Sequence, residues 1–79
     1  MKLELYEYPD WENGTLIGTI AITNGVATPD TDVAHSLIQS MGPRLWNGED
    51  VTPESGEPYL RAIAAALSGP WLRSRLIDD

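Results

Sequence analysis

The stretch from Ser55 to Gly69 constrains the fold of this 79-residue chain more than any other. Four alanines, the residue type with the highest helix propensity, follow a proline that suits the first turn of a helix. The larger apolar side chains recur at helical spacing and form one stripe, made by Tyr59, Leu60, Ile63 and Leu67. Gly69-Pro70 is a typical helix stop. We therefore expect a helix that begins at Pro53 or at Ser55, with the other elements packed around its stripe.

Three short strands are expected in the first third of the chain. Residues 2–8 and 15–23 alternate in polarity, and Asn13-Gly14 is the strongest turn signal between them. Asn24-Gly25 then predicts a tight turn into a third strand at residues 26–28, which Pro29 ends. Short turns between consecutive strands predict an antiparallel meander. In the second strand, one face is expected to carry Leu16, Gly18, Ile20 and Ile22, and Gly18 marks a bulge or a close contact with a neighbour.

A second helix, about ten residues long, is expected after these strands. Asp30 or Thr31 supplies a side-chain oxygen that caps its first turn. Gly42-Pro43 ends it. Its apolar face is expected to consist of Val33, Leu37, Ile38 and Met41.

Two segments leave alternatives open. Residues 42–57 form either a small hairpin around Asn47-Gly48 or a loop, and residues 52–54 can open a short helical turn. Residues 71–77 alternate in polarity and are interpreted as a final strand, with a short helix as the alternative. Together these patterns predict a single α+β domain over residues 1–79, in which an antiparallel sheet in the order β-β-β-α-α-β packs on two helices.

Charge and composition narrow the possible partners. The net charge is −7, and ten of the twelve carboxylates lie within residues 1–57. Such a surface repels phosphate backbones, so we expect no direct nucleic-acid binding and a better match to a basic protein. There is no cysteine for a disulfide and no apolar run of about 18 residues that would span a membrane. We expect no membrane insertion and a cytoplasmic location.

The C-terminal third carries a pattern found elsewhere. Gly56-Glu57-Pro58-Tyr59-Leu60-Arg61-Ala62 is followed by Leu67-Ser68-Gly69-Pro70-Trp71-Leu72. This pattern resembles small uncharacterised proteins of actinobacteria and their phages, which have a strand-rich start, a Gly-Glu-x-Tyr-Leu-x-Ala helix and a Gly-Pro-aromatic-Leu close. The resemblance implies no activity. It favours a phage or prophage setting and, with it, a location in the virion as the alternative to the cytoplasm.

The polar residues do not form a motif typical of an active site. His35 is the sole histidine, which argues against a catalytic triad and against a zinc site in a chain without cysteine. The five serines lack a nucleophile motif, and no glycine-rich loop has the spacing of a phosphate-binding loop. Paired carboxylates can act as an acid–base site, but such a site needs a cleft, and this chain is too short for a deep one. We therefore expect the paired carboxylates to lie on solvated faces. We therefore expect no enzyme, no cofactor and no bound metal.

The candidate protein-binding residues are Trp11, Arg44, Trp46, Glu49 and Asp50. Tryptophan and arginine are enriched in binding hot spots, and both indoles lie in irregular, polar surroundings. The alternative is that each indole folds back over the small core. On the binding interpretation, the chain is a non-enzymatic interaction module. It is then either a structural or accessory subunit that joins copies or neighbours, or a monomeric acidic regulator or inhibitor that binds a basic partner and mimics the charge of nucleic acid.

Overall fold

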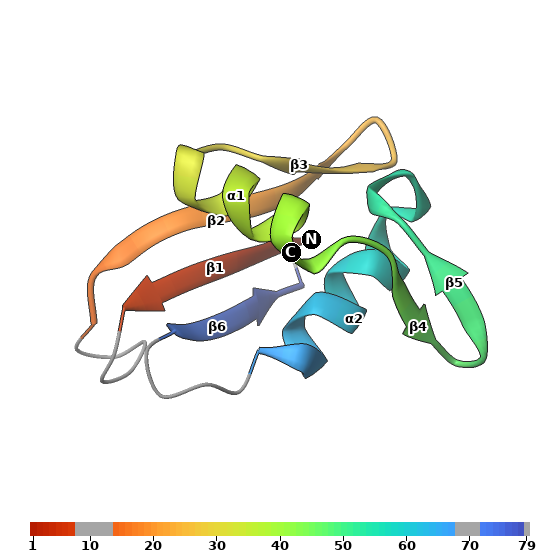
Figure 1. The fold of residues 1–79 in the computed structure, drawn as a ribbon. Coiled ribbons are helices and arrows are strands. Elements are labelled where there is room, and N and C mark those ends of the chain that lie inside the picture. The colour runs from red at the N-terminus through yellow and green to blue at the C-terminus, as the bar shows by residue number, and fades with distance from the viewer. Residues whose placement is uncertain (8–13, 68–71, 79) are drawn as a thin grey trace.

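The architecture is an antiparallel sheet covered by two helices, with a small hairpin at the side of the second helix (Figure 1). A computed structural model describes residues 1–7, 14–67 and 72–78. In chain order the elements are β1 (Lys2–Glu7), β2 (Leu16–Thr23), β3 (Val26–Pro29), α1 (Asp32–Met41), β4 (Arg44–Trp46), β5 (Glu49–Val51), the 3₁₀-helix η1 (Pro53–Ser55), α2 (Glu57–Ala66) and β6 (Leu72–Ile77). The main sheet has the order β3-β2-β1-β6, and β4 pairs only with β5. The predicted α+β class and order of elements are confirmed, with the hairpin β4–β5 added.

One face of the main sheet is apolar because side chains alternate along each strand. Leu3 and Leu5 of β1 are fully buried, and Leu3 pairs with Ile20 of β2 on one side and Leu76 of β6 on the other. Both helices lie on this face (Figure 1). Helix α2 adds three fully buried side chains to the core, those of Tyr59, Leu60 and Ile63.

A bulge in β2 changes which of its side chains face the core. Leu5 pairs with Gly18 whereas Tyr6 pairs with Leu16, so Ile17 is an extra residue on the β2 side. Leu16 therefore shares the outer face with Tyr6 and is 50% exposed. The prediction that Leu16 shares one face with Gly18 and Ile20 is wrong, because the bulge shifts the alternation by one residue.

Helix α1 approaches the sheet through small residues. Thr31, and not Asp30, is its cap, since Thr31 Oγ1 accepts a 3.2 Å hydrogen bond from the Ala34 N–H. A Cβ on Gly18 would lie 2.5 Å from that same oxygen, which confirms the predicted close contact at Gly18. Ala34 is fully buried on the sheet, and Val33 is turned outward and 47% exposed. The prediction that Val33 belongs to the buried face is therefore wrong.

Helix α2 is shorter than predicted at its beginning. It starts at Glu57, and both expected starts, Pro53 and Ser55, lie in the separate turn η1. Gly56 divides the two helices because its φ of +74° lies outside the helical region. The short helical turn expected near residue 53 is confirmed. The stop signal at Gly69-Pro70 lies outside the described residues.

The two open alternatives are both decided in favour of strands. Residues 44–51 form the hairpin β4–β5, with Asn47 and Gly48 at its turn, and β6 is a strand antiparallel to β1. Of the helices that the structure describes, none has the length and apolar character needed to cross a bilayer.

Candidate protein-interaction site

The hairpin β4–β5 presents two different faces. Asn47 and Gly48 have φ values of +50° and +81°, as a two-residue type I′ turn requires. Residues that pair directly across an antiparallel hairpin share a face. Trp46 pairs with Glu49, and Leu45 pairs with Asp50. The hairpin therefore carries an indole and a carboxylate on one face, and a leucine and a carboxylate on the other.

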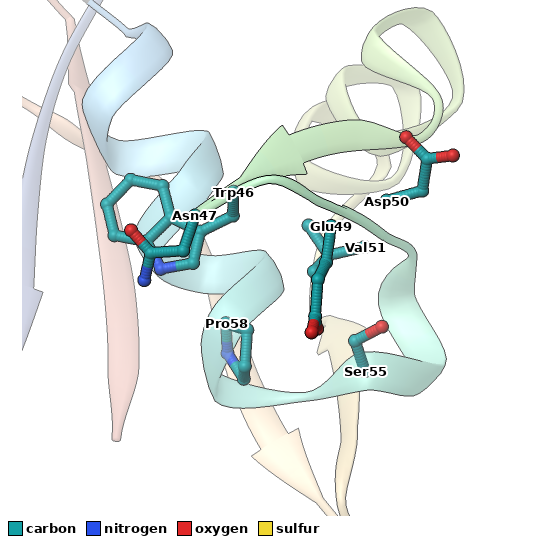
Figure 2. Close-up of a pocket in the computed structure, with 7 residues that line it drawn as sticks. All are labelled: Trp46, Asn47, Glu49, Asp50, Val51, Ser55 and Pro58. Atoms are coloured by element: carbon teal, nitrogen blue, oxygen red, sulfur yellow. The ribbon is translucent and has the colours of Figure 1, made fainter.

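A hollow of about 380 Å³ lies between this hairpin and the turn that leads into α2 (Figure 2). Figure 2 shows the Glu49 side chain running toward Ser55 and Pro58, whereas the Asp50 carboxylate points away. The residues that line the hollow are Trp46, Asn47, Glu49, Asp50, Val51, Ser55 and Pro58. The hairpin thus supplies one wall, and η1 with the first turn of α2 supplies the other.

Both walls are fixed by contacts with the rest of the fold. Trp46 is half-buried and packs against the hydrophobic core. Ser55 Oγ accepts a 3.0 Å hydrogen bond from the Thr52 N–H, which sets its orientation in η1. The Tyr59 hydroxyl donates a 3.0 Å hydrogen bond to the Gly42 carbonyl oxygen and so ties α2 to the segment that enters β4. These contacts fix the positions of both walls of the hollow.

Burial and nearby charges act on the Tyr59 hydroxyl. Burial raises the pKa of Tyr59 above its usual value, the positive charge of Arg44 opposes this, and the negative charge of Glu54 adds to it. Tyr59 therefore remains a neutral hydroxyl that donates its proton to the Gly42 carbonyl. Its role at this site is to position the two walls.

The elements around the hollow carry four carboxylates, those of Glu49, Asp50, Glu54 and Glu57. Hydrogen bonds from its own backbone N–H and from the Thr52 hydroxyl hold the pKa of Glu54 below its usual value. Glu57 is paired with Arg61 at 3.0 Å. Within residues 1–7, 14–67 and 72–78, Glu49 and Asp50 make no ion pair. The hollow is therefore a negatively charged site with an available carboxylate.

The structure brings together four of the five residues that the sequence singled out. Trp46 and Glu49 line the hollow with their side chains, and Asp50 lies at it with its carboxylate turned away. Arg44 is half-buried on the same hairpin but does not line the hollow. The predicted alternatives for Trp46, core or surface, are both true of it, since it packs on the core and borders the hollow. Trp11 lies outside the described residues.

Five residues of the hairpin and the hollow were not among the predicted site residues: Leu45, Asn47, Val51, Ser55 and Pro58. Ser55 and Pro58 were assigned to the predicted long helix, and only the turn at Gly56 brings them to face the hairpin. Leu45 is 69% exposed, although its neighbours Arg44 and Trp46 are half-buried. Period-two alternation around Asn47-Gly48 was the signal that would have placed Leu45 on the outer face.

His35 is exposed on α1 and is not among the lining residues. In the part of the chain that the structure describes, no three His, Cys, Asp or Glu side chains gather closely enough to hold a metal ion.

Comparison of the chain with protein-family models, curated proteins and solved structures finds no match. The function is therefore argued from the geometry and charge of this surface.

Proposed function

We propose that the protein is a non-enzymatic interaction module that binds another protein through the β4–β5 hairpin and the start of α2. The observation that carries the proposal is the composition of the two faces of this hairpin. One face carries the half-buried Trp46 and the Glu49 carboxylate, which makes no ion pair among the described residues, and the other carries the exposed Leu45. An aromatic and an aliphatic side chain bordered by charged groups are typical of a protein-binding surface.

Two versions of this function differ in the partner. In the first, the chain is a structural or accessory subunit of a phage-related assembly, in the cytoplasm or in the virion. The exposed Leu45 and the resemblance of residues 56–62 and 67–72 to small uncharacterised proteins of actinobacteria and their phages support it. In the second, the chain is a monomeric acidic regulator of a basic protein. The net charge of −7 and the Glu49 carboxylate, which makes no ion pair in the part of the chain that the structure describes, support this version.

The native mass, measured by light scattering after size exclusion at low and high salt, tests the proposal. The assembly version predicts a species larger than 8.7 kDa that survives high salt and that Leu45→Ser converts to the monomer. Val33→Ser is the matched control, because Val33 is also exposed but lies on α1. The regulator version predicts a monomer whose partner binding falls as salt rises. An assembly that Leu45→Ser leaves intact would contradict an interface at the hairpin.

A further inference from the structure

We infer that the hollow beside the β4–β5 hairpin receives an arginine or lysine side chain from a basic segment of the partner protein. This inference rests on the proposed interaction function and specifies the chemistry of the partner. It assigns recognition to the Glu49 face of the hairpin, and not to the acidic surface as a whole.

The lining of the hollow matches both parts of a basic side chain. Arginine and lysine have an apolar stem and a charged head, which favour different surroundings. The Trp46 indole and the Pro58 ring offer apolar surface to the stem. The Glu49 side chain extends into the same space, and its carboxylate lies on the side of the hollow where Ser55 is found (Figure 2). A carboxylate provides a charge-assisted hydrogen bond for the head, and an indole nearby adds attraction for a cation.

Among the described residues, the Glu49 carboxylate makes no ion pair and no hydrogen bond. Glu57, which lies in the first turn of α2 but does not line the hollow, already has Arg61 as its partner at 3.0 Å. Arg44 shares a hairpin face with Glu49, yet no ion pair joins them among the described residues. A cation that arrives from another molecule therefore gains an attraction that no internal pair has to give up.

The start of α2 does not turn the hollow into an anion site. Helix N-termini attract anions through free backbone N–H groups. Here Pro58 has no N–H, and the N–H groups of Tyr59 and Leu60 donate to the Gly56 carbonyl at 3.0 and 3.2 Å. Glu57 places a negative charge in the first turn. The site therefore disfavours phosphate and favours a cation.

The size of the hollow favours a single side chain. Its volume of about 380 Å³ lies near the lower end of the range of roughly 300–1,000 Å³ that small-molecule sites occupy. The hairpin beside it is free to contact the flanking residues of a peptide, and Leu45 is exposed on its other face. A side chain carried by a protein segment uses both features, whereas a free amine uses only the hollow.

An NMR titration with short peptides tests the inference. The probes are acetyl-Gly-Arg-Gly-Arg-Gly-amide, the same peptide with lysine, and the same peptide with citrulline, which keeps the shape of arginine without its charge. The arginine and lysine peptides should shift the indole N–H signal of Trp46 and the backbone amide of Glu49. The citrulline peptide should shift neither.

Two variants with the same change in net charge locate the binding. Glu49→Gln should weaken binding of the arginine peptide about tenfold, as expected for the loss of a charge-assisted hydrogen bond. Asp50→Asn is the matched control, since its carboxylate points away from the hollow, and it should weaken binding less than about twofold. Both positions are exposed, and the amide spectrum of each variant checks that it is folded.

The possible results separate the inference from the function on which it rests. Equal losses in the two variants, or binding of the citrulline peptide, would overturn recognition by the hollow. Failure of every basic peptide to bind, together with an assembly that Leu45→Ser dissociates, would overturn the inference and leave the interaction function standing. If no basic peptide binds and the protein stays monomeric at both salt concentrations, both fail.

Discussion

Gly56→Ala tests the packing that joins the start of α2 to the main sheet. Gly56 has φ +74° and ψ −123°, a backbone conformation that residues with a Cβ rarely adopt. An added Cβ would also lie 2.6 Å from the carbonyl oxygen of Gly25, in the turn between β2 and β3. Because this oxygen belongs to the backbone, it cannot rotate away as a flexible side chain would. We therefore expect both strain and a clash in the folded state.

The expected loss is large for a domain of this size. The backbone strain costs about 1–3 kcal/mol, and crowding of a packed contact typically adds about 1–3 kcal/mol. A total of roughly 2–6 kcal/mol compares with an unfolding free energy of about 4–12 kcal/mol, at about 0.05–0.15 kcal/mol per residue. The corresponding fall in Tm is at least about 8 °C.

Urea denaturation and thermal melting followed by circular dichroism measure this loss, and Gly48→Ala supplies the control. Gly48 has φ +81°, and an added Cβ there meets no atom within 4 Å, so only strain applies. The difference between the two variants contains the contact with Gly25 together with any difference in backbone strain between the two glycines. If Gly48→Ala loses as much stability as Gly56→Ala, the clash does not exist in solution and the reasoning is refuted.

Three further changes test single interactions. Tyr59→Phe removes the hydrogen bond to Gly42 and should lower the unfolding free energy by about 1 kcal/mol in urea; no change would mean that the bond adds nothing. Thr31→Ala removes the cap on the Ala34 N–H, should cost about 1 kcal/mol, and should speed hydrogen exchange at the start of α1 but not in α2. Because folding lowers the pKa of Glu54, its contribution is complete above the usual value of 4.5 and is lost as the pH falls below it. Glu54→Gln should therefore flatten the acid side of the curve of stability against pH, and an unchanged curve would contradict this.

Local signals in the sequence determine most of the fold. The Asn-Gly pairs at 24–25 and 47–48 occur in turns with positive φ, and the alanine-rich segment forms α2. These features depend on neighbouring residues alone and can be read from a short window. The outward position of Leu16 could not be predicted from a short window of sequence, because the bulge depends on how β2 pairs with β1. The orientation of Val33 likewise depends on a contact between α1 and Gly18, which lies in a different element.

In the candidate site, too, some features depend on neighbouring residues and others depend on contacts between distant parts of the chain. Trp46 and Glu49 were found because unusual residue types stand close together in the chain. Ser55 and Pro58 belong to the facing wall and have no unusual chemistry of their own. Their part in the hollow follows from the break at Gly56, whose position is set by a contact with the turn between β2 and β3. A wall built by such a distant contact leaves no local pattern in the sequence.

The residues that shape the hollow are therefore different from the residue that gives it its charge. Gly56 and Tyr59 hold the facing wall through backbone and buried contacts, so changes there act on binding only by altering the fold. Glu49 is exposed and makes no ion pair among the described residues, so its charge contributes little to stability. A binding surface of this kind can change its preference for a partner through Glu49 without loss of the fold. Under the proposed recognition, Glu49→Gln should thus lower affinity at unchanged Tm, whereas Gly56→Ala should lower both.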